Sequence, residues 1–159
     1  MSTATPGVVP TATIDVVAPD DPDLASAIAE ARRASGFAAH EHRLTGEIVL
    51  AFVYDDEIAR LNLQHRRIAM PTDVLTFPSA YGGDVAIAIG YLSRQAARRK
   101  VAIENEAAIL ALHGILHLAG YDDVEDGDRL AMQRETKRLA DALNVPCEDE
   151  WTSLPESGS

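Results

Sequence analysis

The stretch IENEAAILALHGILHLAGYDD, residues 103–123, decides how this chain folds. From about Ile103 to Ala119 it is mostly apolar, which predicts a long helix buried in the protein. Gly120 predicts the end of that helix, because glycine readily adopts the left-handed conformation that closes a helix. The expected element is therefore a buried helix that ends just before Gly120.

Two histidines stand on this helix. His113 and His117 are four residues apart, so they project from one helical face with Cβ atoms about 5–6 Å apart, which suits two imidazoles that bind one metal ion. Gly120 lets the chain reverse, so that the carboxylate of Asp122 or Asp123 can supply a third ligand. The alternative is a pair of core histidines satisfied by backbone groups. A buried helix that carries two such polar groups favours the metal site.

Three protein ligands leave one coordination position for water, which is the arrangement that hydrolysis requires. Zinc, one ion per chain, is the metal expected for two imidazoles and one carboxylate, because it lowers the pKa of a bound water towards neutrality. Iron, nickel and manganese are the alternatives. The pattern thus indicates a metal-dependent hydrolase.

The rest of the chain alternates between strand and helix signals. Stretches rich in β-branched and apolar residues predict strands at 13–18, 46–54, 72–78 and 84–89. Capping residues and helical periodicity predict further helices at 21–36, 55–65, 91–100 and 125–143. We therefore expect an α+β (mixed α/β) fold in which helices cover a roughly four-stranded mixed sheet and the metal site lies on a buried helix.

Length and composition indicate a single domain in a reducing, cytoplasmic setting. The 159 residues suit one domain, which we expect at 12–145 between a flexible leader at 1–11 and a flexible tail at 146–159. Cys147 is the only cysteine, so no intramolecular disulfide is possible. The leader lacks the pattern of a secretory signal, and no membrane span is expected. The formal charge of −11 argues against nonspecific nucleic-acid binding, and no DNA partner is expected.

The run from His113 to Asp123 resembles the signature H-G-x-L-H-L-x-G-Y-D-H of the YbeY-type bacterial endoribonucleases that mature ribosomal RNA. It matches that signature except at the last position, where Asp123 stands in place of the family's third metal-binding histidine. The resemblance covers most of the chain between the tails. The further matching residues are Leu61, Asn62, Arg66, the segment 71–78, Gly83, Asp84, Met132 and Glu135.

The resemblance implies a metal site made of His113, His117 and Asp123, and a catalytic role for Arg66. The guanidinium of Arg66 suits contact with a phosphate during phosphodiester cleavage. The implied function is a metal-dependent, single-strand-specific endoribonuclease that acts in ribosomal RNA maturation, including the 3′ end of the small-subunit RNA, and in ribosome quality control. Its implied partners are single-stranded or ribosomal RNA and ribosomal particles.

Two other functions compete with this one. A zincin-like metallopeptidase also places two histidines four residues apart, but it needs H-E-x-x-H, and Gly114 occupies the position of the glutamate base. A ribosome-associated RNA-binding factor with weak or no catalysis is favoured by Asp123 and opposed by the open coordination position.

Other charged residues have simpler interpretations. A basic group at Arg94, Arg98, Arg99 and Lys100 can track a nucleic-acid backbone, although a solvated helix face is the preferred reading. His40, His42 and His65 lie away from the motif. Asp73 and Asp84 either line a cleft or serve as turn and capping residues.

Overall fold

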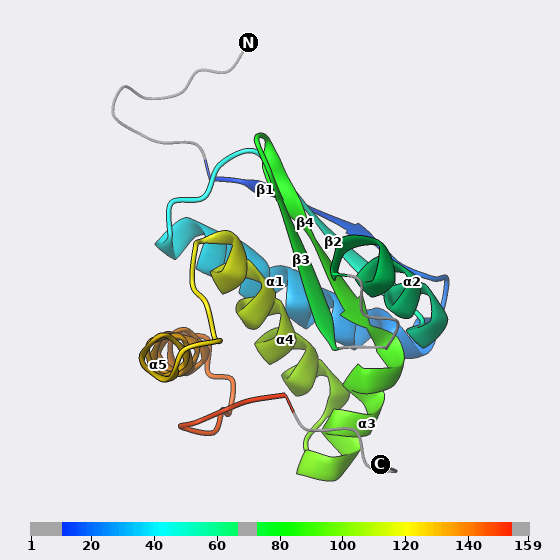
Figure 1. The fold of residues 1–159 in the computed structure, drawn as a ribbon. Coiled ribbons are helices and arrows are strands. Elements are labelled where there is room, and N and C mark those ends of the chain that lie inside the picture. Colours follow the sequence, from blue (N-terminus) through cyan, green and yellow to red (C-terminus); the bar gives the residue numbers. More distant parts are fainter. Residues whose placement is uncertain (1–10, 67–72, 154–159) are drawn as a thin grey trace.

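The structure is a computed structural model that describes residues 11–66 and 73–153, without the side chains of His65 and Arg66. Figure 1 shows a twisted sheet with helices around it. In chain order the elements are β1 (Thr13–Val17), a short 3₁₀ helix (Pro22–Leu24), α1 (Ala25–Glu41), β2 (Glu47–Val53), α2 (Asp55–Arg66), β3 (Val74–Ser79), β4 (Gly82–Ala88), α3 (Ile89–Arg99), α4 (Ile103–Leu118) and α5 (Asp126–Ala142).

The sheet has four strands in the order β1-β2-β4-β3. β1 and β2 pair in parallel, as do β2 and β4, whereas β3 runs antiparallel to β4. β3 and β4 form a tight hairpin in which Ser79 faces Gly82, and β3 is left at the edge of the sheet. The C-terminal half of α4 therefore packs on both strands of this hairpin, and β3 forms the open edge of the sheet beside it.

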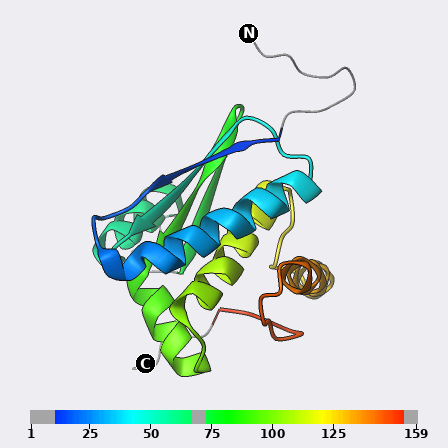
Figure 2. The same ribbon diagram turned by 180° about the vertical axis from the view of Figure 1, so that it is seen from behind.

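Helices cover both faces of the sheet. The main core joins α1 and α4 to one face through buried residues that include Ile48, Leu50, Val85, Ile87 and Leu112. The opposite face packs on α2 through a second group: Val53, Ile58, Leu75, Ala86 and Ala88. In the view from behind, α1 lies across α4, and α5 lies on the side of α4 away from the sheet (Figure 2).

The predicted α+β class, the four-stranded mixed sheet and the buried helix that carries the histidines are confirmed. One boundary differs clearly, because the helix predicted to end at Gly36 continues to Glu41. Gly36 lies inside the helix, and nothing approaches within 4 Å of where its Cβ would be. The strand predicted from residue 72 is described from Val74 onward, and residue 72 lies outside the described residues.

The division of the chain into leader, domain and tail stays a prediction, but the segment after α5 differs from a free tail. Val145 and Trp151 are buried in the main core, and Trp151 is only 4% exposed. An indole buried in this way anchors its segment, because its large apolar surface is removed from water. Across the described ranges, no single helix has the length and apolar character needed to cross a membrane.

Candidate metal centre

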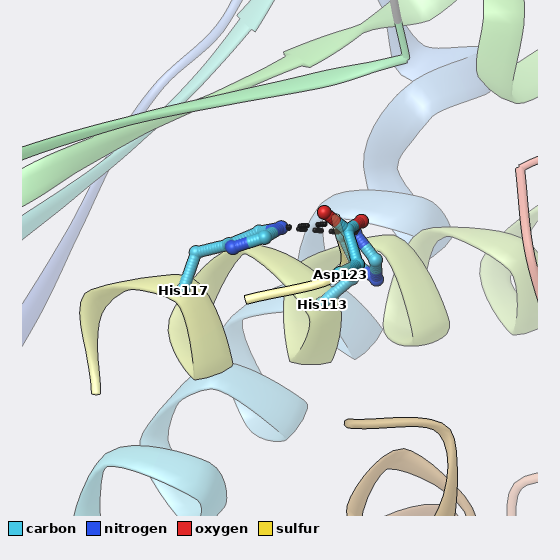
Figure 3. Close-up of side chains that lie close together, drawn as sticks. All are labelled: His113, His117 and Asp123. Atoms are coloured by element: carbon cyan, nitrogen blue, oxygen red, sulfur yellow. Dashed lines mark hydrogen bonds and ion pairs between the residues drawn. The ribbon is translucent and has the colours of Figure 1, made fainter. Parts of the chain in front are cut away.

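Three side chains converge at the C-terminal end of α4. The Nε2 atoms of His113 and His117 lie 3.2 Å apart. One carboxylate oxygen of Asp123 lies 3.3 Å from His113 Nε2 and 3.7 Å from His117 Nε2. Figure 3 shows the two imidazoles and the carboxylate pointing toward one another. The predicted metal-binding group is thus assembled in space, and it is a cluster that can hold a metal ion.

The helix end and the following loop place the third side chain. Gly120 has a φ of 102°, and the amide of Tyr121 donates a hydrogen bond to the Leu116 carbonyl at 2.9 Å, which reverses the chain. The Asp122 carboxylate accepts hydrogen bonds from the amides of Asp123 and Val124, at 2.7 and 3.2 Å. Asp122 therefore shapes the loop, and Asp123 presents its carboxylate to the histidines.

The local environment favours the metal-binding protonation states of His117 and Asp123. Burial, and then the neighbouring His113, lower the pKa of His117, which favours its neutral imidazole. A hydrogen bond from His113 holds the pKa of Asp123 below its usual value, which favours the carboxylate. His117 also donates its Nδ1–H to the Tyr121 carbonyl at 3.0 Å, so its Nε2 lone pair faces the cluster.

The donor atoms fit a small divalent ion. Three ligands about 2.0–2.1 Å from a tetrahedral zinc ion would lie roughly 3.3 Å from one another, close to the 3.2, 3.3 and 3.7 Å found here. His113, His117 and Asp123 expose 12, 26 and 41% of their side chains, so the cluster is shielded on the helix side and reachable from the loop side. Three protein ligands leave a position open for water or substrate.

Gly114 is the point where α4 comes closest to the sheet. A Cβ on this residue would lie 2.4 Å from Cγ1 of Val85, which is fully buried. The Thr76 hydroxyl also donates to the Gly114 carbonyl at 3.3 Å. Glycine thus brings the ligand-bearing helix against β3 and β4, and the glutamate of a peptidase motif has no room here.

Two hollows meet at the metal cluster. One, of about 860 Å³, runs beside the edge strand β3 and is lined by Asp73, residues 74–78, His113, His117, residues 122–124 and Ser153. The other, of about 370 Å³, lies between α4, α5 and the segment after α5, and is lined by His113, Asp123, Arg129, Met132, Gln133, Thr136 and residues 151–153. The cluster can therefore be approached from either side.

Comparison with known proteins places the chain in a family. The family model described as Endoribonuclease YbeY matches residues 20–144. The chain belongs to the YbeY family. The protein named Endoribonuclease YbeY from Pelotomaculum thermopropionicum is 37% identical, over 77% of this chain and 85% of that relative. The protein of the same name from Novosphingobium aromaticivorans is 41% identical, over 76% of this chain and 81% of that relative. The one from Gloeobacter violaceus is 34% identical, over 96% of this chain and 85% of that relative.

A solved structure shares the fold of this chain. The solution structure of TM1509 from Thermotoga maritima has a TM-score of 0.56 and 25% sequence identity, and the match covers 92% of this chain and 99% of that one. The structural similarity therefore extends over nearly the whole of the fold described above. The predicted resemblance is confirmed, and with it the class of the chain as a member of an endoribonuclease family.

The other residues singled out in the sequence either lie outside the described residues or have different places in the structure. Arg66 is the last residue of α2, and its side chain, like that of His65, lies outside the described residues. His40 contacts Thr11 at the surface, and His42 pairs with Glu135 at 2.6 Å. Asp84 is exposed on β4. Asp73, in contrast, is buried and lines the larger hollow.

The predicted basic group is split between different environments. Arg94 pairs with Asp55 at 2.9 Å, whereas Arg99 is 6% exposed and pairs with the buried Glu106 at 3.1 Å. Arg99 is therefore part of the interior and lies on neither a solvated face nor a nucleic-acid track. Its guanidinium also lies over the Trp151 ring, 4.7 Å from the centroid, and donates to the Thr152 carbonyl.

Residues 151–153 contribute to the site, although they fall in the segment that the sequence predicts to be a flexible tail. The Trp151 ring lies 5.6 Å from the His113 ring, centroid to centroid, and Ser153 hydrogen-bonds to Asp73. Figure 1 shows this segment turning back from α5 towards α3. Trp151 is the only tryptophan of the chain, and an isolated large aromatic residue in a polar stretch is the signal that could have identified it.

Proposed function

We propose that this protein is a metal-dependent endoribonuclease that cleaves single-stranded RNA during ribosomal RNA maturation, including that of the small-subunit 3′ end, and in ribosome quality control. The observation that carries the proposal is the convergence of His113, His117 and Asp123 on one point, next to two hollows, in a chain of the YbeY family. Relatives named as endoribonucleases support RNA as the substrate.

The three clustered side chains are the proposed ligands of one zinc ion per chain. When bound, such an ion supplies Lewis acidity, which makes a water molecule more acidic and offsets negative charge on a phosphodiester. The lowered pKa values of His117 and Asp123 favour the deprotonated forms that ligands need. Tyr121 fixes the tautomer of His117 through its carbonyl.

Arg66 is the proposed catalytic residue outside the metal cluster. Its guanidinium would bind the phosphate and stabilise charge that builds up during cleavage, because arginine offers a planar pair of donors to phosphate oxygens. Ribosomal particles are the proposed partners and the cytoplasm the proposed location. Both follow from a substrate that is ribosomal RNA.

The test combines elemental analysis with an RNA cleavage assay. We expect about one zinc ion per chain, chelator-sensitive cleavage of single-stranded RNA, and much slower cleavage of the same sequence in a duplex. His117→Ala should lose both metal and cleavage. His40→Ala is the matched control, because His40 lies at the surface and bonds to Thr11.

The outcomes separate the competing functions. Metal with RNA binding but no cleavage would replace the proposed enzyme by an RNA-binding factor. Full metal content in His117→Ala would overturn the proposed ligand set. Full RNA cleavage by Arg66→Ala would remove Arg66 from the catalytic group.

A further inference from the structure

We propose that the smaller hollow between α4, α5 and residues 151–153 is a nucleobase-binding pocket, which takes the base of a nucleotide next to the scissile phosphate. The inference rests on the proposed function, because an RNA substrate is what brings a base to this place. It adds a specific subsite on α5 that is separate from the metal ligands.

The position of the hollow suits the base of a nucleotide bound at the cluster. His113 and Asp123 line this hollow as well as the metal cluster, so the hollow opens directly beside the reacting centre. A phosphodiester held at the cluster has a nucleoside attached on each side. One of these two nucleosides would then lie next to the hollow.

Size and chemistry fit a base. The volume of about 370 Å³ lies at the small end of the range of about 300–1,000 Å³ that is usual for ligand pockets. Met132 and Trp151 supply apolar wall, and Thr136 and Gln133 supply polar groups. Sequence-specific recognition of single-stranded RNA uses this combination of apolar contact and hydrogen bonds to the edges of splayed-out bases.

Gln133 is the residue expected to read the base. It lies on α5 and is partly exposed, and its amide makes no hydrogen bond within the part of the chain that the structure describes. An amide offers both a donor and an acceptor, which matches the edge of a base. Thr136, in contrast, already donates its hydroxyl to the Met132 carbonyl at 2.8 Å.

Charge directs the RNA strand to this hollow rather than along β3. Asp123 lines both hollows, but the larger one is also lined by the carboxylates of Asp73 and Asp122, which repel a polyanion. Arg129 is the only cation among the described residues that line either hollow. It pairs with the exposed Asp126, so its guanidinium stays at the surface, where an adjoining phosphate can bind.

The pocket wall is built to hold its shape. Residues 151–153 are fixed by Arg99, which contacts the Trp151 ring and the Thr152 carbonyl, and by the hydrogen bond between Ser153 and Asp73. Arg99 is itself paired with buried Glu106. A wall fixed from behind in this way is preorganised, which reduces the entropy lost when a base binds.

Because Trp151 is the only tryptophan, its indole N–H gives a single nuclear magnetic resonance signal that reports on the pocket. The metal-loaded protein is titrated with adenosine, guanosine, cytidine and uridine, and separately with inorganic phosphate. We expect at least one nucleoside to shift the indole signal saturably, and Gln133→Leu to weaken that binding at least fivefold. Gln64→Leu, the same change on exposed α2 across the sheet, should bind as the wild type does.

The proposal is overturned if no nucleoside moves the indole signal, if Gln133→Leu binds as tightly as the wild type, or if phosphate alone gives the same shift. Gln133→Glu is the second variant should Gln133→Leu fail to fold, and the same spectra report folding. Nucleoside binding does not need cleavage. A protein that binds nucleosides but leaves RNA intact would support the pocket and contradict the proposed function. A protein that cuts RNA without binding nucleosides would support the proposed function and contradict the pocket.

Discussion

The Nδ1 atom of His117 lies 3.0 Å from the carbonyl oxygen of Tyr121, the residue that follows the glycine turn. Because a carbonyl only accepts, Nδ1 must carry the hydrogen, and the loop that positions Asp123 also orients His117. The loop therefore orients two of the three proposed ligands. This coupling makes Asp123 the informative position for substitution.

The effect of an Asp123 substitution on metal affinity should depend on whether the replacement can bind the ion. Asp123→Ala removes a proposed ligand. Loss of an outer-shell partner already costs about tenfold to hundredfold in metal affinity, so we expect the loss of zinc affinity to be at least that large. Asp123→His supplies a third imidazole and should keep about one ion per chain. Competition against a chromophoric chelator measures both. Wild-type affinity in Asp123→Ala would show that the carboxylate is not a ligand.

Gly114→Ala should destabilise the protein. The new Cβ would meet Val85 at 2.4 Å inside the core, and overpacking of this kind costs about 1–3 kcal/mol. Gly36→Ala is the matched control, because Gly36 lies within α1 with open space around it and should be neutral or stabilising. Urea unfolding monitored by circular dichroism measures both variants, and equal effects would contradict the close packing of α4 on the sheet.

Glu106 should give the stability of the protein an unusual pH dependence. Burial raises the pKa of Glu106 from 4.5 to about 7, although Arg99 opposes the shift. The folded state therefore holds a proton that the unfolded chain releases, so this contribution to stability is full below about pH 4.5 and is lost as the pH rises to about 7.

The measurement is the difference in the free energy of unfolding between Glu106→Gln and the wild type. As the pH rises through this window, the free energy of unfolding of the wild type should fall relative to that of Glu106→Gln, by at most about 3 kcal/mol. Glu104→Gln, in the first turn of the same helix, is the control, and its difference from the wild type in the free energy of unfolding should not change in this way with pH. A pH-independent difference for Glu106→Gln would contradict the raised pKa.

Trp151→Ala should lower stability by about 3–5 kcal/mol, since it removes a buried indole from the core. It should also weaken zinc binding, because the indole packs beside the His113 ring. Trp151→Phe keeps an aromatic wall, so it should lose less stability and less zinc affinity than Trp151→Ala. Thermal unfolding and chelator competition provide the two measurements, and a stable Trp151→Ala protein would mean that residues 151–153 form no fixed wall.

The helix pattern and the ligand spacing could be predicted because they are local. An apolar run, two histidines four residues apart and a glycine stop are all written in consecutive residues, and the structure brings His113, His117 and Asp123 together as expected. The strand order could not be predicted in this way, because it depends on contacts between distant segments. Neither β3 nor β4 contains a local sequence signal that places β4 between β2 and β3.

The residues that sequence reasoning misassigned are those whose environment depends on distant segments. Arg99 looked like a surface cation within a basic run, but Glu106 and Trp151 enclose it from two other parts of the chain. Gln133 and Arg129 lie on the helix predicted at 125–143, to which the sequence pattern assigned no functional role. Their place beside the metal cluster comes from how α5 crosses α4.

The division of the ligands between a helix and a loop has a consequence for how the site can diverge. His113 and His117 share α4 with residues packed on every side, so changes there disturb the core as well as the chemistry. Asp123 lies beyond Gly120 and is partly exposed, where a replacement leaves the packing untouched. Mutational drift in the coordination sphere is therefore expected to concentrate at this third position, which makes it the natural point for retuning metal preference without refolding the protein.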